Sequence, residues 1–134
     1  MKLYNTVKSL ILEMASSEAI IDAIRNKNVL SIYYMGDEPG GLGLRLIEPV
    51  CFGISKAGNR VLRAWELEGA SHRYVKGTRP MPGWRYFRLD KISSVNLTGD
   101  KFNTPRPDYN PNGDDLMTSV EINANFNVWK TKTI

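Results

Sequence analysis

The first 28 residues carry their apolar side chains at helical spacing. The apolar positions of the first stretch recur every three or four residues, as on one face of a helix: Leu3, Val7, Leu10, Ile11 and Met14. A second stripe follows at residues 20–24, and Ser16 or Ser17 is a suitable N-cap for it. Residues 26–28, Asn-Lys-Asn, supply a stop signal. We therefore expect two N-terminal helices.

From residue 29 the apolar period changes to two, which is the spacing of β-strands. Five segments show this alternation: residues 29–34, 44–54, 59–67, 84–90 and 92–97. Their links are hairpin-like, and none is long and helical enough for the crossover that a parallel sheet needs. The pattern predicts a mainly β domain with N-terminal helices, in which five short strands form a small, strongly bent barrel. Pro49 is expected at a bulge or an edge, because it cannot donate a ladder hydrogen bond.

The fourth of these strands mixes aromatic and basic residues in the run WRYFRLD. Alternate side chains of a strand share a face, so Arg85, Phe87 and Leu89 are expected to point one way, and Phe87 and Leu89 are expected to enter the core. Tyr86 and Arg88 then share the other face, where an aromatic ring beside a guanidinium can stack a base and hold its phosphate. An ordinary cross-strand ladder on a half-exposed sheet is the alternative interpretation.

Positive charge is concentrated in the middle of the chain. The net charge is +4, but residues 45–91 alone contain ten Lys and Arg residues against Glu48, Glu66, Glu68 and Asp90. A basic field confined to one segment attracts phosphates, whereas the same charge spread evenly would mainly keep the protein soluble. A solvated basic face without a ligand is the plainer alternative.

The connection at residues 68–83 adds to this charge, and it is far longer than a barrel hairpin needs. Long loops inside a compact domain are usually functional or disordered. We expect this one to contribute to binding. The side chains that it offers to an anionic ligand are His72, Arg73, Lys76 and Arg79.

The composition disfavours several classes of function. Cys51 is the only cysteine, which excludes an intrachain disulfide and a thiolate zinc site and agrees with a reducing cytoplasm. No apolar run is long enough for a membrane span, and the N-terminus lacks the uninterrupted apolar stretch of a signal peptide. A metal site for hydrolysis built from Glu66, Glu68 and Asp90 is conceivable, but three acids among ten basic residues are more simply ion-pair partners. We expect a cytoplasmic, non-enzymatic protein with neither metal nor cofactor.

The order of these features resembles that of the WYL domain, a small SH3/Sm-like barrel found in bacterial and phage regulators. The likeness runs through VLSIYY, LRLIEPVCFGISKAGNRVLRAW and WRYFRLDKI, and its most specific pieces are LIEPV, with Arg45 ahead of it, and FRLDKI. It implies a five-stranded WYL-like barrel domain at residues 19–102, preceded by a helical extension at 1–18. Residues 103–134, rich in Pro, Asn and Asp, would form a C-terminal arm that wraps the barrel or a partner.

WYL domains use a basic pocket or groove to sense nucleic-acid fragments or nucleotides, often to switch an attached DNA-binding domain. Carried over by position, the resemblance points to Tyr33 or Tyr34, Arg45, Arg85, Arg88 and Lys91. The tripeptide that names the family would fall on residues 60–62, Arg-Val-Leu, where only the leucine is kept. Arg60 would add a cation in place of a tryptophan, a departure that bears on the ligand more than on the fold.

The resemblance therefore implies a regulatory, transcription-related protein that binds single-stranded nucleic acid or a nucleotide and has no membrane partner. About 18 residues precede the domain, too few for a winged helix-turn-helix, so a standalone domain of the kind found in phages is expected. Its effect would come from direct binding or from a partner such as RNA polymerase. The alternative is a protein interaction module whose barrel and arm dock on a polymerase or on a second copy of the chain.

Overall fold

The computed structural model describes residues 2–36, 42–69 and 82–126. Its one α-helix, α1, spans Lys2–Asn26 without a break, so the prediction of two helices is wrong. The Ser17 hydroxyl does not cap a second helix; it donates a 2.9 Å hydrogen bond back to the Met14 carbonyl, inside the helix. The predicted stop is confirmed: Lys27 adopts a left-handed φ of 56°, and the first strand begins at the next residue. No helix in this part of the chain has the length and apolar character to cross a membrane.

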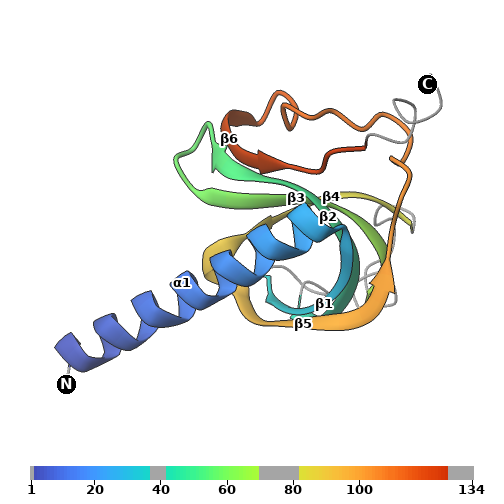
Figure 1. Ribbon diagram of the computed structural model, residues 1–134. Coiled ribbons are helices and arrows are strands. Elements are labelled where there is room, and N and C mark those ends of the chain that lie inside the picture. The colour runs from blue at the N-terminus through green and yellow to red at the C-terminus, as the bar shows by residue number, and fades with distance from the viewer. Residues whose placement is uncertain (1, 37–41, 70–81, 127–134) are drawn as a thin grey trace.

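The strands form one antiparallel sheet in the order β4-β3-β2-β1-β5, with β6 paired to β2 (Figure 1). Their bounds are β1 Asn28–Met35, β2 Leu42–Ser55, β3 Arg60–Gly69, β4 Gly83–Arg88, β5 Ile92–Lys101 and β6 Met117–Asn123. The first five confirm the strands that the alternation predicts. β6 was not predicted, because its alternation is short and its partner lies far away in the sequence.

β2 is the long central strand, and it changes partners along its length. It pairs with β3 along one edge, and its other edge pairs with β1 over residues 42–47 and with β6 over residues 51–55. The register of the β2–β3 ladder shifts between Pro49 and Cys51, in agreement with the prediction of a bulge or an edge at the proline. The turn after β2 is tight, with Gly58 at a φ of 87°, as the Ala-Gly-Asn sequence predicts.

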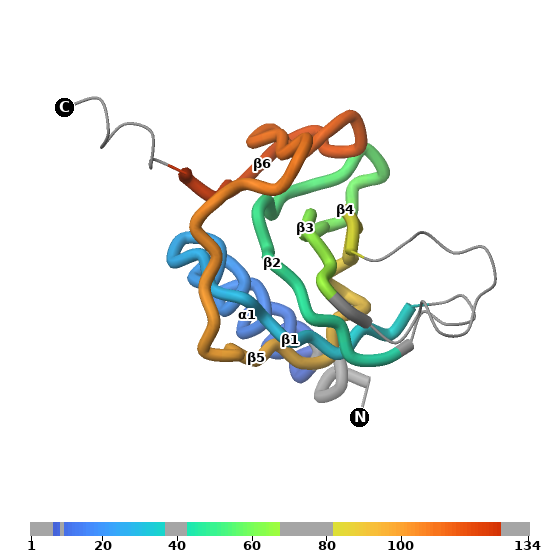
Figure 2. Tube along the Cα trace, turned by 90° about the vertical axis from the view of Figure 1, so that its right-hand side faces the viewer, coloured from blue at the N-terminus to red at the C-terminus, as the bar shows by residue number. Residues whose placement is uncertain are grey.

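The sheet is strongly curled, as Figure 2 shows, but strand pairing does not close it into a barrel. β4 and β5 are the two ends of the strand order, joined by the short 3-10 helix η2, Leu89–Lys91. Tyr34 of β1 reaches the β4 end of the curl, where its ring lies edge-on to Phe87 with centroids 4.9 Å apart. The prediction of a closed five-stranded barrel is therefore corrected to a curled, open sheet of six strands.

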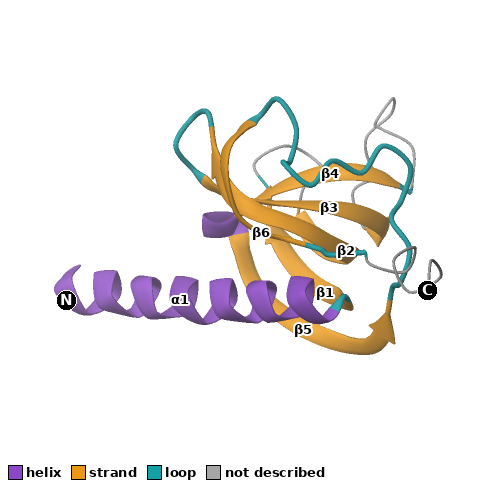
Figure 3. Cartoon of the chain, turned by 45° about the horizontal axis from the view of Figure 1, so that its top comes forward, coloured by secondary structure: helices purple, strands orange, loops and turns teal. Residues whose placement is uncertain are grey.

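Among the side chains of α1 that the structure describes, those buried in the core lie in its C-terminal half. Ile20, Ala23 and Ile24 are fully buried in the core, whereas Val7 and Leu10 are about half exposed. Figure 3 shows α1 lying along one side of the strands, with its N-terminal half extending past them. The helix runs through residue 18 without interruption, and the domain boundary expected there stays a prediction.

The described part of the C-terminal arm belongs to the same sheet. Residues 103–116, which we call the strap, connect β5 to β6 and contain neither helix nor strand. β6 then pairs with β2, and Ala124 donates a 2.8 Å backbone hydrogen bond to Val50. The arm thus folds back onto its own domain.

Candidate functional site

Two arginines and a glutamate meet on the core-facing side of three neighbouring strands. Arg45 lies on β2, Glu66 on β3 and Arg85 on β4, each in alternation with buried apolar residues. Arg45 Nη1 donates a 3.1 Å hydrogen bond to Glu66 Oε2, and Arg85 Nε lies 3.2 Å from Glu66 Oε1. All three are buried, and Glu66 is fully so. One carboxylate is therefore shared by two guanidiniums inside the sheet.

Aromatic rings complete this arrangement. The Arg45 guanidinium carbon lies 5.5 Å from the centroid of Tyr34 and 5.7 Å from that of Phe87, within the range of cation–π attraction. The Tyr34 hydroxyl accepts a 3.1 Å hydrogen bond from the backbone N–H of Arg88. We call Tyr34, Arg45, Glu66, Arg85 and Phe87 the inner cluster.

A second cation–aromatic group lies on the opposite face of β3 and β4. The predicted alternation on β4 is confirmed, with Trp84 and Tyr86 pointing away from Arg85 and Phe87. The Arg63 guanidinium carbon lies 4.6 Å from the Tyr86 centroid and 5.1 Å from the Trp84 centroid. These three residues and Asp114 form what we call the outer cluster.

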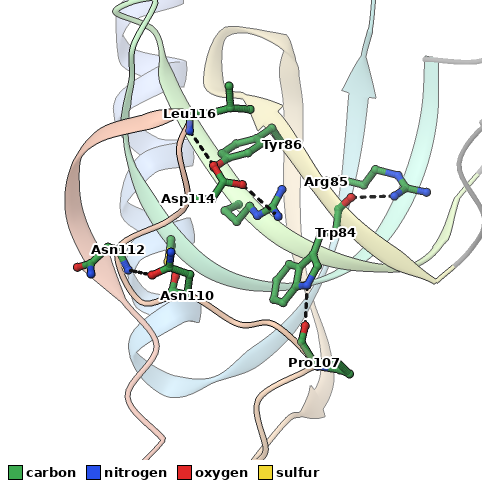
Figure 4. Close-up of polar contacts among 10 residues, drawn as sticks. Trp84, Arg85, Tyr86, Pro107, Asn110, Asn112, Asp114 and Leu116 are labelled. Carbon is green, nitrogen blue, oxygen red and sulfur yellow. Dashed lines mark hydrogen bonds and ion pairs between the residues drawn. The ribbon is translucent and has the colours of Figure 1, made fainter.

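The strap covers this outer face (Figure 4). Tyr86 donates its hydroxyl hydrogen bond to Asp114 Oδ1, and Arg63 Nη2 lies 3.2 Å from Asp114 Oδ2. Trp84 Nε1 donates a 2.8 Å hydrogen bond to the Pro107 carbonyl. Arg106 forms two hydrogen bonds with the buried Glu48, of 2.9 and 2.7 Å. The face expected to stack bases is therefore in contact with the protein's own chain.

These contacts shift two pKa values. Burial, followed by the hydrogen bond to the Asp114 carboxylate, raises the pKa of Tyr86. Burial alone would raise the pKa of Asp114, but the hydrogen bonds from Tyr86 and the Leu116 amide and the charge of Arg63 outweigh it, so this pKa lies below its ordinary value. Both shifts keep a neutral phenol donating to an ionised carboxylate over a wide pH range.

The remaining predicted residues are dispersed. Arg60 begins β3, pairs with Glu121 of β6 at 2.8 Å and covers the ring of Phe52. Arg88 is 43% exposed and forms a 2.7 Å ion pair with Asp90, while Lys91 is half-buried at the end of η2. Tyr33 is half-buried on β1. His72, Arg73, Lys76 and Arg79 lie outside the described residues.

The local basic charge is compensated partly by Glu66 and Asp90 of the same segment and partly by acids that lie far away in the sequence. Asp114 and Glu121, both from the arm, pair with Arg63 and Arg60. Sequence reasoning missed Arg63 and Asp114. One signal was available in the sequence. Residues 103–116 contain three aspartates and one arginine, so their charge is opposite to that of the basic segment at residues 45–91.

The acidic residues considered for a metal site do not converge in the described part of the chain. Glu66 is paired with two buried arginines, and Asp90 is paired with Arg88 at the surface. Among the residues that the structure describes, no group of three His, Cys, Asp or Glu side chains could hold a metal ion. Cys51 is buried, and burial raises the pKa of its thiol.

No protein-family model matches the chain, and no curated protein matches it. Among solved structures, the chain is similar to proteasome accessory factor B/C (PafBC) of Arthrobacter aurescens, with 21% sequence identity and a TM-score of 0.51. The match covers 69% of this chain and 13% of that chain. The likeness is one of fold. It is compatible with the expected resemblance to the WYL domain and extends no further than the architecture.

Proposed function

We propose that this protein is a WYL-like regulatory domain that acts by binding, without catalysis, and that its ligand is single-stranded nucleic acid or a nucleotide. The observation that carries the proposal is the position of the Arg63 guanidinium of β3 on the outer face of the sheet, 4.6 Å from the ring centroid of Tyr86 and 5.1 Å from that of Trp84, both of β4. A ring beside a guanidinium offers a stacking surface and a phosphate contact together.

The surface-accessible contact in this scheme is Arg88. Its ion pair with Asp90 is exposed, and pairs of this kind contribute only about 0 to 1 kcal/mol. A phosphate can therefore replace the carboxylate at little cost. The backbone N–H of Arg88 is held by Tyr34, which links this exposed cation to the inner cluster.

The WYL assignment is supported by the order of the sequence motifs and by the likeness of fold to PafBC, a protein named as a proteasome accessory factor. The transcription-related role is what the resemblance to WYL domains implies. The chain spans 13% of that protein's length, so its partners are not carried over.

The test is the binding of fluorescent single-stranded DNA, single-stranded RNA and duplex DNA at about 50 and about 200 mM salt. We expect affinity for a single strand that falls steeply with salt, because phosphate binding releases counterions. Arg88→Ala should weaken binding at low salt on the order of tenfold, the effect of one charge-assisted hydrogen bond.

Arg25→Ala is the matched control. Arg25 also forms an exposed ion pair with an aspartate of its own segment, Asp22 at 3.1 Å, but it lies on α1. Both variants remove one positive charge. Equal losses in the two variants, or binding that ignores salt, would contradict the proposal.

A second candidate function, docking on a protein partner or on a second copy of the chain, is favoured by one observation. Val7, Leu10, Ile11 and Met14 share one face of α1 and are between 46% and 59% exposed, on the half of the helix that extends past the sheet. Apolar stripes of this kind are typical of helix interfaces.

This candidate predicts a change in oligomeric state or partner binding in the double variant Leu10→Ser/Ile11→Ser, measured by light scattering after gel filtration. Leu97→Ser is the control, because Leu97 is an exposed apolar residue on β5. If the wild-type protein is monomeric and elutes like both variants, self-association through this face of α1 is ruled out.

A further inference from the structure

The strap is a segment fixed at both ends and free of regular structure between them. Upstream, β5 pairs with β1, and downstream, β6 pairs with β2. Residues 103–116 can therefore leave the outer face without breaking either strand pairing. Loops held mainly by side-chain contacts open at lower free energy than the strands that anchor them.

The contact that holds the strap over the outer cluster has the chemistry of a phosphate site. The Asp114 carboxylate receives the Tyr86 hydroxyl on one oxygen and faces Arg63 with the other. A guanidinium and a phenol converging on two oxygens of one anion would serve a phosphodiester equally well. Asp114 is 33% exposed and Arg63 is 19% exposed, so the anion lies at the solvent boundary.

The surroundings of this anion favour a nucleic-acid strand. Arg63 lies between the rings of Trp84 and Tyr86, and the Trp84 indole N–H is held by the carbonyl of Pro107, another strap residue. Leaving of the strap would expose a cation flanked by two aromatic rings. Single-stranded nucleic acids are bound by such stacking surfaces combined with phosphate contacts.

We infer that the strap is a built-in competitor: Asp114 occupies the position of a phosphate, and single-stranded nucleic acid binds the outer cluster by displacing residues 103–116. This inference rests on the proposed function and adds to it the site and its regulation. The Asp114 carboxylate provides one charge, whereas a nucleic-acid strand provides several phosphates and stacking bases. The strand therefore displaces the strap only when it contacts the protein at more than one place.

The test measures the affinity of a fluorescent oligo-dT for the wild-type protein and for Asp114→Asn. The amide keeps the shape of the carboxylate and loses its charge, so the strap competes less well and binding should tighten on the order of tenfold. Adding Arg63→Ala to Asp114→Asn should abolish this gain, because the phosphate contact is lost.

Glu121→Gln is the matched control. Glu121 belongs to β6 of the same arm, pairs with Arg60 at 2.8 Å, and its loss changes the net charge by the same amount. Its effect on affinity should be much smaller. Glu48→Gln provides a second route if Asp114→Asn fails to fold, since it weakens the hydrogen bonds that hold Arg106 of the strap, leaves the outer cluster intact and should also tighten binding.

Cys51 gives a readout of strap opening that needs no nucleic acid. It is the only cysteine, it is buried, and its Sγ lies 3.5 Å from the Asn110 carbonyl oxygen of the strap. Iodoacetamide should label it faster in Asp114→Asn than in the wild type, and oligo-dT should speed labelling of the wild type.

The outcomes separate this inference from the proposed function. If the wild type binds oligo-dT but Asp114→Asn and Glu121→Gln bind alike, the strap is not a competitor and only this inference is overturned. A gain that survives Arg63→Ala overturns it too. If no variant binds any single strand while Cys51 labelling still rises in Asp114→Asn, the strap opens without a nucleic-acid ligand, and both proposals fail.

Discussion

The inner and outer clusters are built from the same chemistry and differ in burial. In each, an arginine lies beside two aromatic rings and pairs with a carboxylate: Arg45 with Glu66 at 3.1 Å and Arg63 with Asp114 at 3.2 Å. The inner carboxylate is fully buried and comes from a neighbouring strand, whereas the outer one is 33% exposed and comes from the strap.

Because of this difference, the Arg45–Glu66 pair is part of the core, whereas the Asp114 carboxylate on Arg63 can be replaced by another anion. Removing a partner from a buried ion pair leaves an uncompensated charge where water cannot reach it. At the outer cluster, water or another anion can take the place of Asp114. Residue type alone therefore does not separate structural from binding arginines; the origin and exposure of the carboxylate do.

The strongest test of this comparison is Glu66→Gln. The isosteric amide would leave Arg45 and Arg85 buried without the carboxylate that they share. We expect a loss of about 3 to 5 kcal/mol in the free energy of unfolding, the usual effect of breaking a buried pair from one side. Chemical denaturation measures it.

Glu121→Gln, at an exposed pair with Arg60, should cost less than about 1 kcal/mol in the same assay. A loss at Glu66 as small as at Glu121 would show that the inner cluster contributes little to stability, and the distinction between the two clusters would fail.

A smaller effect is expected from paired removals of a phenolic oxygen. Tyr34→Phe removes the acceptor of the Arg88 backbone N–H and should cost about 1 to 2 kcal/mol, because a backbone donor loses its partner. Tyr86→Phe should cost less, since the half-exposed Asp114 carboxylate can be hydrated instead. Thermal or chemical denaturation of both variants measures the two losses of stability. A larger loss in Tyr86→Phe than in Tyr34→Phe would contradict the assignment of inner and outer faces.

The sequence predicted most of what depends on local pattern. The alternation located β1 to β5, the chemistry of Pro49 located the bulge, and the period of two separated Tyr86 from Phe87. The continuous helix was missed because serine is a common N-cap residue. In the structure, the Ser17 hydroxyl instead donates a hydrogen bond to the Met14 carbonyl inside the helix.

The rest depends on which distant segments meet. β6 follows a long irregular stretch and pairs with residues 51–55, and no local feature of the sequence specifies that partner. The resemblance to the WYL domain pointed to Tyr34, Arg45 and Arg85 by position. No local feature of the sequence predicted that Asp114 pairs with Arg63. A barrel was predicted from the number of strands, their hairpin-like links and the resemblance to the WYL domain. Pairing between the end strands is a tertiary property that none of these contains.

The finest test uses pH. Because the pKa of Asp114 is lowered in the folded protein, the unfolded chain binds the proton first as the pH falls. The contribution of Asp114 is therefore complete above its ordinary pKa of about 3.8 and is lost progressively below it. Asp114→Asn should show a shallower loss of melting temperature in acid than the wild type.

Asp115→Asn, which alters the exposed neighbouring carboxylate, is the control and should keep the wild-type acid profile. On the alkaline side the sign reverses for Tyr86, whose pKa is raised: its contribution is complete below the ordinary tyrosine value of about 10 and is lost as the pH rises beyond it. Loss of the acid slope in Asp114→Asn would show that the contact between strap and sheet accounts for the acid sensitivity of the outer face. An unchanged acid slope would mean that the strap is held by its other contacts, Arg106 with Glu48 and Trp84 with Pro107, and that Asp114 does not hold it closed.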